Sequence, residues 1–338
     1  MKKFFCLFWV TVFILGFSGV PAAHAQRRKI TIKLASMVPE NTPWGVKLNQ
    51  MSREWAQITG GEVELMVYHN GVAGEEADVI RKLRLNQIQG AVLTSFGLNA
   101  ISPEILTLSC PFLIRNESEL DAVLENLKPE LEKRIDEKGF FTLAWSKAGW
   151  VRIFSKTPVT LPSDLKKLKT GTNPNEPEME QALKTIGYPV VPVNSSEAMV
   201  ALNSGRIDAV YQSPVMVAGM QLFGITKYMT SINIAPVMGG IVLNRVAWRA
   251  VPERYKAQII ESAKRIEREM DGEIQRLERE AISTMTRYGL TTLQLTPQQD
   301  QVWYDDVERS YPAMLGTTLN RNIFEKIDTI LKAHRSKR

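Results

Sequence analysis

Residues 30–68 read ITIKLASMVPENTPWGVKLNQMSREWAQITGGEVELMVY and contain the pattern that decides the fold. Apolar and polar side chains alternate over residues 30–35, which predicts a strand, and residues 62–68 are predicted to form a second strand. Between them, residues 44–58 carry apolar side chains at helical spacing, and Gly60-Gly61 is a typical helix end. A strand, a helix and a second strand in this order indicate a parallel sheet covered by helices.

The same alternation continues through the chain in two successive blocks. The first block adds a predicted helix over residues 75–85 and a strand over residues 90–93. The second block is predicted to contain strands at residues 151–154, 189–193, 209–211 and 240–243 and helices at residues 162–165, 178–186 and 195–203. Because 338 residues exceed what one hydrophobic core usually organises, we predict two α/β lobes.

The most regular element of the chain is predicted over residues 255–288. Its apolar side chains run from Tyr255 to Tyr288, 33 residues in 9 steps, or about 3.7 residues per step. That period favours a straight helix along a globular body over the 3.5-residue period of a coiled coil. At ~1.5 Å per residue the helix would be roughly 50 Å long, enough to run along both lobes. A coiled-coil dimer formed through this helix is the alternative.

Residues 1–25 have the features of a secretory signal peptide. Lys2 and Lys3 precede an apolar run that ends near Phe17, and Ala23-His24-Ala25 forms a small-residue cleavage site. The apolar run is shorter than the roughly 20 residues that a membrane-spanning helix needs, although an uncleaved anchor is the alternative. The processed chain is therefore expected in the periplasm.

The processed chain offers few groups for catalysis. Of the 3 histidines, His24 is lost with the signal peptide, and His69 and His334 lie far apart in the sequence. Cys110 would be the one remaining cysteine, so neither a disulfide nor a zinc site is expected. No phosphate loop or dinucleotide fingerprint occurs. We therefore expect no catalytic residue, no metal and no cofactor.

The charge balance gives little reason to expect a nucleic-acid partner. The formal net charge is +6, from 42 basic and 36 acidic residues, and Lys2 and Lys3 leave with the signal peptide. An exported, two-lobed chain without catalytic groups is typical of a binding protein that closes around a small molecule.

Five segments of the chain are informative when they are taken together: residues 32–43, residues 60–76 with GGEVELMVYHNGVAGEE, residues 108–113 with LSCPFL, residues 158–168 with PVTLPSDLKKL, and residues 197–208 with EAMVALNSGRID. In the same order, they resemble segments of the solute-binding receptors of TRAP (tripartite ATP-independent periplasmic) transporters. Each segment alone is a weak motif. Their correct order over some 200 residues makes the resemblance specific.

The resemblance implies an α/β, two-lobed periplasmic binding protein fold with hinge strands near residues 148–152 and 234–240 and one long bridging helix. It implies that residues 26–148 plus 237–275 form lobe I and residues 149–236 plus 276–338 form lobe II. It also implies a monomeric receptor, not an enzyme, that captures a small molecule between the lobes and delivers it to TRAP membrane permease subunits. A periplasmic TPR-type accessory protein accompanies some such systems and is a further candidate partner.

Two basic positions of the family pattern are absent from this sequence. Gly171 stands where the family has its carboxylate-binding arginine, and Val151 stands at a second basic position, with Arg152 one residue later. A slip of one residue in a strand turns the side chain to the opposite face, unless a bulge restores it. We therefore predict a neutral or hydrophobic ligand. The resemblance places the ligand-binding residues at Val38, Trp44, Glu75, Ser95, Phe96, Trp150, Arg152, Gly171, Asn173, Tyr211, Gln212, Ser213 and Met238.

Two other functional classes stay open at this point. One is a periplasmic sensor or a ligand- or lipid-carrying protein that has the same fold but is not coupled to transport. The other is an enzyme built on a binding-protein scaffold, because a fold alone does not fix function. Adjacent genes for two membrane subunits would favour the transport receptor, and an activity lost on changing a cleft residue would favour the enzyme.

Export should be accompanied by cleavage after Ala25. N-terminal analysis of protein recovered from the periplasm of the native host is expected to begin near Gln26, because the small residues before it fit the signal peptidase site. Full-length chain retained in the membrane fraction would contradict this prediction.

Overall fold

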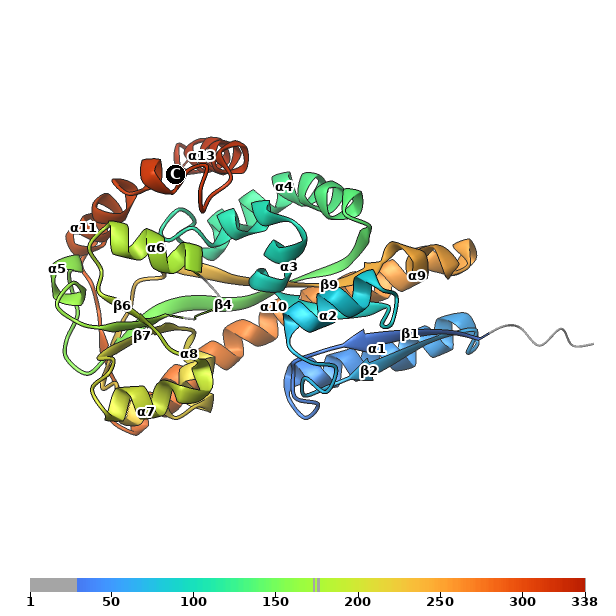
Figure 1. Ribbon diagram of the computed structural model, residues 1–338, viewed down its shortest axis with the longest axis horizontal. Helices are drawn as coiled ribbons and strands as arrows, with labels where there is room; N and C mark the ends of the chain where they lie inside the picture. Colours follow the sequence, from blue (N-terminus) through green and yellow to red (C-terminus); the bar gives the residue numbers. More distant parts are fainter. Residues whose placement is uncertain (1–28, 173, 175–176, 338) are drawn as a thin grey trace, which may run out of the picture.

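The computed structural model describes residues 29–172, 174 and 177–337 (Figure 1). The predicted signal peptide lies outside these residues. In the first part of the chain, β1 (Ile30–Ala35) lies between β2 (Val63–Tyr68) and β3 (Gly90–Thr94) and runs parallel to both. The connections contain α1 (Pro43–Thr59) and α2 (Glu76–Arg84), so the predicted strand–helix–strand unit is confirmed.

The centre of the molecule is a pair of antiparallel strands, β4 (Phe140–Ser155) and β9 (Ala235–Asn244). β9 also pairs with β3, which joins it to the first sheet, while β4 pairs farther along with β7 (Ala209–Gln212) and β8 (Tyr228–Thr230). Lobe I is therefore built on β1, β2, β3 and β9, and lobe II on β5 to β8. The strand order β2-β1-β3-β9-β4-β7-β5-β6 confirms the two-lobed α/β fold.

Lobe II repeats the parallel arrangement of lobe I. Its strands β5 (Thr170–Thr172) and β6 (Val190–Pro192) run parallel to each other, and β5 runs parallel to β7. β10 (Thr291–Leu293) adds a parallel edge beside β8. The shorter helical segments of the two lobes are α3 (Ser95–Ile101), η1 (Pro103–Ser109), α5 (Pro162–Leu165), α6 (Pro177–Thr185), η2 (Ser195–Glu197), α7 (Ala198–Asn203), α8 (Pro214–Gly219), η3 (Leu222–Gly224), α9 (Arg245–Ala250) and α12 (Tyr311–Met314).

The predicted strand at residues 151–154 is only the end of β4, which begins at Phe140. The register of β4 against β9 shifts between Thr142 and Ala144 and again between Lys147 and Trp150. Gly149 lies in the second irregularity with a φ of 88°. These bulges interrupt the two-residue alternation, which is why the sequence pattern does not identify the first part of the strand.

α10 (Glu253–Arg287) is the predicted long helix, and it passes from lobe I to lobe II through the middle of the view in Figure 1. Its buried residues Ile259, Ile266 and Ile274 belong to the core of lobe I, whereas Met285 belongs to a core of lobe II. The helix packs against α1, β4 and α8. The apolar stripe is therefore covered by this chain itself, as the 3.7-residue period predicts.

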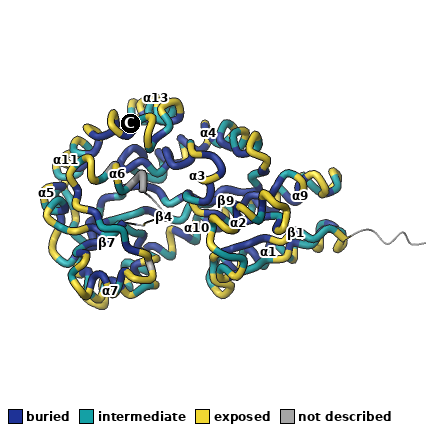
Figure 2. Tube along the Cα trace, in the orientation of Figure 1, coloured by how far each residue is buried: buried dark blue, intermediate teal, exposed yellow. Residues whose placement is uncertain are grey.

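The C-terminal helices cover the upper side of the molecule in Figure 1. α11 (Pro297–Glu308) contacts α5 of lobe II, whereas α13 (Arg321–Arg335) packs on α4 (Glu117–Glu137) and η1, which precede β4 in the chain. The exposed residues gather on the outer faces of these helices (Figure 2). The predicted division of the chain at residues 148, 236 and 275 stays a prediction.

Replacing Gly149 with Ala should destabilise the fold by about 1–2 kcal/mol, because L-residues are strained at this positive φ. An added Cβ would lie at an ordinary contact distance of 3.5 Å from the carboxylate of Glu278, so the expected loss comes from the backbone and not from a clash. Gly219 is the matched control, since a Cβ there meets nothing within 4 Å. Urea unfolding should show the loss for Gly149→Ala alone; equal stability of the two variants would contradict a strained bulge.

Candidate functional site

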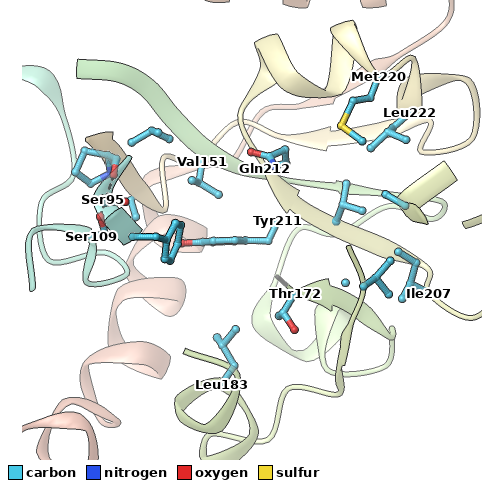
Figure 3. A pocket seen from close by; sticks show the side chains of 18 of the residues that line it. Ser95, Ser109, Val151, Thr172, Leu183, Ile207, Tyr211, Gln212, Met220 and Leu222 are labelled. Carbon is cyan, nitrogen blue, oxygen red and sulfur yellow. Dashed lines mark hydrogen bonds between the residues drawn. The ribbon is translucent and has the colours of Figure 1, made fainter. Parts of the chain in front are cut away.

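A cavity of about 190 Å³ lies between the two lobes. Lobe I contributes residues of α3, η1 and the start of β9, and lobe II contributes residues of β5, α6 and β7. Figure 3 shows Tyr211 extending across the cavity towards Ser95 and Ser109. The other polar side chains of the lining are Thr172 and Gln212, and no Arg, Lys, His, Asp or Glu occurs among the described residues that line it. The cavity is therefore apolar with a few neutral hydrogen-bonding groups, as is typical of small-molecule sites.

Five of the predicted site residues line this cavity: Ser95, Phe96, Gly171, Tyr211 and Gln212. Ser95 and Phe96 form the first turn of α3, and the other three come from the ends of β5 and β7. The carboxyl ends of the parallel strands β3, β5 and β7 thus meet the cleft, which is where ligands bind in open α/β sheets.

Other predicted site residues lie away from the cavity. Trp150 and Met238 are buried in the hydrophobic core, and the Ser213 hydroxyl caps α8 by accepting a hydrogen bond from the Met216 amide at 3.4 Å. Val38, Trp44, Glu75 and Arg152 are likewise not lining residues, and Asn173 lies outside the described residues. Ligand binding by each of the predicted residues stays a prediction.

Alternation along β4 separates Val151 from Arg152. Val151 lines the cavity, while the Arg152 guanidinium points to α10 and lies 3.9 Å from a carboxylate oxygen of Glu278. Burial lowers the pKa of Arg152, and the nearby Glu278 opposes that shift. Burial also raises the pKa of Glu278, which Arg152 counteracts. The bulge before Trp150 does not return Arg152 to the cleft, so Arg152 completes a buried ion pair behind the strand.

Glu76, and not the predicted Glu75, shapes the edge of the cavity. The Thr94 amide donates to Glu76 Oε1 at 2.6 Å, and the Thr94 hydroxyl donates to Oε2 at 2.8 Å. The Thr94 hydroxyl oxygen also accepts from the Phe96 amide at 3.3 Å, which caps α3. Glu76 therefore holds the turn that presents Ser95 and Phe96 to the cleft. Gly97 gives the carboxylate its space, because a Cβ there would lie 2.8 Å from Glu76 Oε2.

Sequence reasoning missed several lining residues. Leu106 and Ser109 come from η1, and Leu183 comes from α6. Ser109 belongs to the LSCPFL segment of the family resemblance, but that segment gave no binding residue. Thr172 adjoins the predicted Gly171, and its buried hydroxyl has no hydrogen bond within the described part of the chain. Its position at the carboxyl end of a parallel strand is the signal that points to it.

The described residues hold no cluster of three or more His, Cys, Asp or Glu side chains that could bind a metal ion. Within the same part of the chain, no helix is both long enough and apolar enough to cross a membrane. The Cys110 thiol is buried, and burial raises its pKa strongly, which suppresses thiolate chemistry.

Residues 34–317 match the family model of the bacterial extracellular solute-binding proteins, family 7. This chain belongs to that family. A solute-binding protein of Verminephrobacter eiseniae is 26% identical over 236 residues, 69% of this chain and 70% of the relative. The C4-dicarboxylate-binding periplasmic protein DctP of Rhodobacter capsulatus is 22% identical over 284 residues, 82% of this chain and 84% of that protein.

A solved structure of similar fold is a TRAP periplasmic solute-binding protein from Chromohalobacter salexigens with bound D-glucuronate. It matches with a TM-score of 0.79 at 19% identity, over 88% of this chain and 99% of that one. The resemblance to TRAP receptors is thus confirmed. The chain is a solute receptor of this periplasmic family and not an enzyme, and such receptors bind small molecules and work with membrane permease subunits.

Replacing Arg152 with Met should cost about 3 kcal/mol of stability at neutral pH, because Glu278 would stay buried without a cation. The raised pKa of Glu278 means that the folded state holds the proton more tightly than the unfolded chain. The stability of Arg152→Met should therefore recover as pH falls from neutral through the folded-state pKa. Urea unfolding at several pH values tests this dependence.

The double variant Arg152→Met/Glu278→Gln is the control, because it removes both charges. Its unfolding free energy should exceed that of Arg152→Met at neutral pH and should vary less with pH. If Arg152→Met is as stable as the wild type at neutral pH, the pair contributes nothing and the assignment is wrong.

Proposed function

We propose that this chain is the periplasmic receptor of a TRAP-type secondary transporter and that its ligand is a small neutral or hydrophobic molecule. The receptor is exported through the cleavable signal peptide at residues 1–25, captures the ligand in the cavity between the lobes, and delivers it to the membrane permease. The observation that carries the ligand class is the absence of any charged side chain among the described residues of the cavity wall.

The energetic argument concerns an unpaired charge. Burying a ligand carboxylate without a cationic partner costs several kcal/mol, and neutral hydroxyls and amides compensate only part of it. A neutral ligand avoids that cost and can use the hydroxyls of Ser95, Ser109 and Thr172 and the amide of Gln212. Arg152 does not supply the missing cation, because its guanidinium lies on the other face of β4 with Glu278.

The relatives favour a second candidate, a small carboxylate. One is named for C4-dicarboxylates and another was crystallised with D-glucuronate. A carboxylate in this cavity would have to be held by hydroxyl, amide and backbone donors alone.

Calorimetry with matched ligand pairs distinguishes the two candidates. D-glucose against D-glucuronate and succinamide against succinate differ chiefly in charge, and we expect each neutral member to bind at least tenfold more tightly. If either acid binds with micromolar affinity and its neutral counterpart does not bind, the proposal of a neutral ligand is contradicted and that of a carboxylate ligand is supported. Mass spectrometry of molecules that co-purify with the receptor gives an independent identification.

A further inference from the structure

A second, smaller cavity of about 40 Å³ adjoins the first. Ten of its 12 lining residues are buried. The two that are only half-buried, Leu183 and Tyr211, also line the interlobe cavity. This second cavity, the side pocket, therefore adjoins the ligand cavity at these two side chains.

The side pocket is apolar and uncharged. Its walls include Ile153, Val190 and Trp303, from β4, β6 and α11. The indole nitrogen of Trp303 donates to the Thr160 carbonyl at 3.0 Å. The Tyr188 hydroxyl donates to Asp306 Oδ2 at 2.9 Å, and burial raises the pKa of Tyr188, so it stays neutral. Both groups thus have partners inside the protein.

The Thr170 hydroxyl differs from these two groups in its hydrogen bonding. Its side chain is 4% exposed and lines the side pocket, and its hydroxyl oxygen makes no hydrogen bond within the described residues. A buried hydroxyl without a partner is costly, so a ligand atom that pairs with it would gain a favourable contact. The side pocket offers few polar groups to hold a buried water, which needs two to four polar partners, because the Trp303 indole and the Tyr188 hydroxyl already donate within the protein.

We propose that the side pocket is a second compartment of the ligand site and receives a short branched apolar group of the ligand that carries at most one hydroxyl or carbonyl. This inference rests on the proposed receptor function and deepens it. The volume corresponds to roughly three water-sized atoms, which fits an isopropyl-sized group. The ligand then has a polar part between the lobes, an apolar branch behind Tyr211, and one polar atom within reach of Thr170.

Two homologous series of probe molecules test the side pocket, whether the polar group that binds between the lobes is an amide or a carboxylate. Acetamide and 3-methylbutanamide form the neutral series, and acetate and 3-methylbutanoate form the acidic series. One of the two series is expected to bind to the wild type. In that series, the branched member should bind at least tenfold more tightly than the short member, because this is the effect of burying about two methylene groups. Ligand-observed NMR titration measures this ratio at millimolar affinities.

The matched variants are Val190→Ile and Val210→Ile. Val190 lines only the side pocket and Val210 only the interlobe cavity, and each is a buried strand residue that accepts a β-branched replacement. Val190→Ile fills the pocket and should reduce the branched-to-short ratio at least threefold. Val210→Ile should change the affinity for both members alike and leave their ratio as in the wild type.

A second pair of variants tests the hydroxyl. Thr170→Val and Thr172→Val remove adjacent buried hydroxyls, one from each compartment. With 4-hydroxy-3-methylbutanamide as the probe, Thr170→Val should weaken binding about tenfold but leave the affinity for 3-methylbutanamide unchanged. Thr172→Val should not discriminate between these two probes.

The outcomes separate this inference from the proposed function. If the acids bind tightly and the amides bind weakly, the proposal of a neutral ligand is contradicted. The ratio of the affinities for the branched and the short acid would still test the side pocket. No preference for the branched member in either series, including no detectable binding of any probe, overturns the side pocket. Crystals pressurised with xenon test the pocket with a probe that has no polar group. Xenon bound beside Ile153 and Trp303 supports the pocket, and its absence there overturns it.

Discussion

The pairing of β4 with β9 on one side and with β7 on the other is the constraint on which the rest of the structure depends. Because one continuous strand belongs to both sheets, the lobes cannot be placed independently of each other. The cleft lies where β4 passes from one sheet to the other, and α10 follows the same junction from behind. Backbone rotation confined to such a junction would move the lobes as rigid bodies, which is how hinged receptors close.

The two faces of this junction have opposite electrostatic character. Val151 and Ile153 line the two cavities, whereas Arg152 turns to Glu278 and Lys147 contacts Asp121 and Asp271 at 2.8 and 3.2 Å. Burial would lower the pKa of Lys147, but these carboxylates raise it, so the lysine stays charged. The ionic groups thus join β4 to α4 and α10 and stay out of the cleft. A strand with this alternation can stabilise the junction with charges and still offer a neutral site.

Regular elements of secondary structure could be predicted from the sequence, whereas irregular ones could not. The unit from β1 to β2 and the helix α10 follow simple periods, and both were predicted correctly. The first part of β4 was missed because two bulges break its alternation. In the site, family position placed Ser95 and Tyr211 in the cavity wall, but it also named Met238, whose side chain is buried in the core beside the lining residue Val237. A motif does not show which of two neighbouring residues points its side chain into the cleft.

The side pocket could not be predicted at all, because Phe112, Thr170 and Trp303 meet there only through the tertiary fold.

The neutral character of the cleft does not depend on Gly171 alone. A Cβ at Gly171 would lie 2.9 Å from the Cδ1 atom of Ile207, which is fully buried and also lines the cavity. Because Cδ1 is the far end of a flexible side chain, a small shift of Ile207 would make room for a larger residue, so packing at this one position does not exclude an arginine. The neighbouring side chains matter as well, since the described lining holds no charged group and Arg152 is turned to Glu278 on the other face of β4. The neutral cleft is therefore a property of the whole lining, to which Val151, Gly171 and Ile207 each contribute an uncharged position.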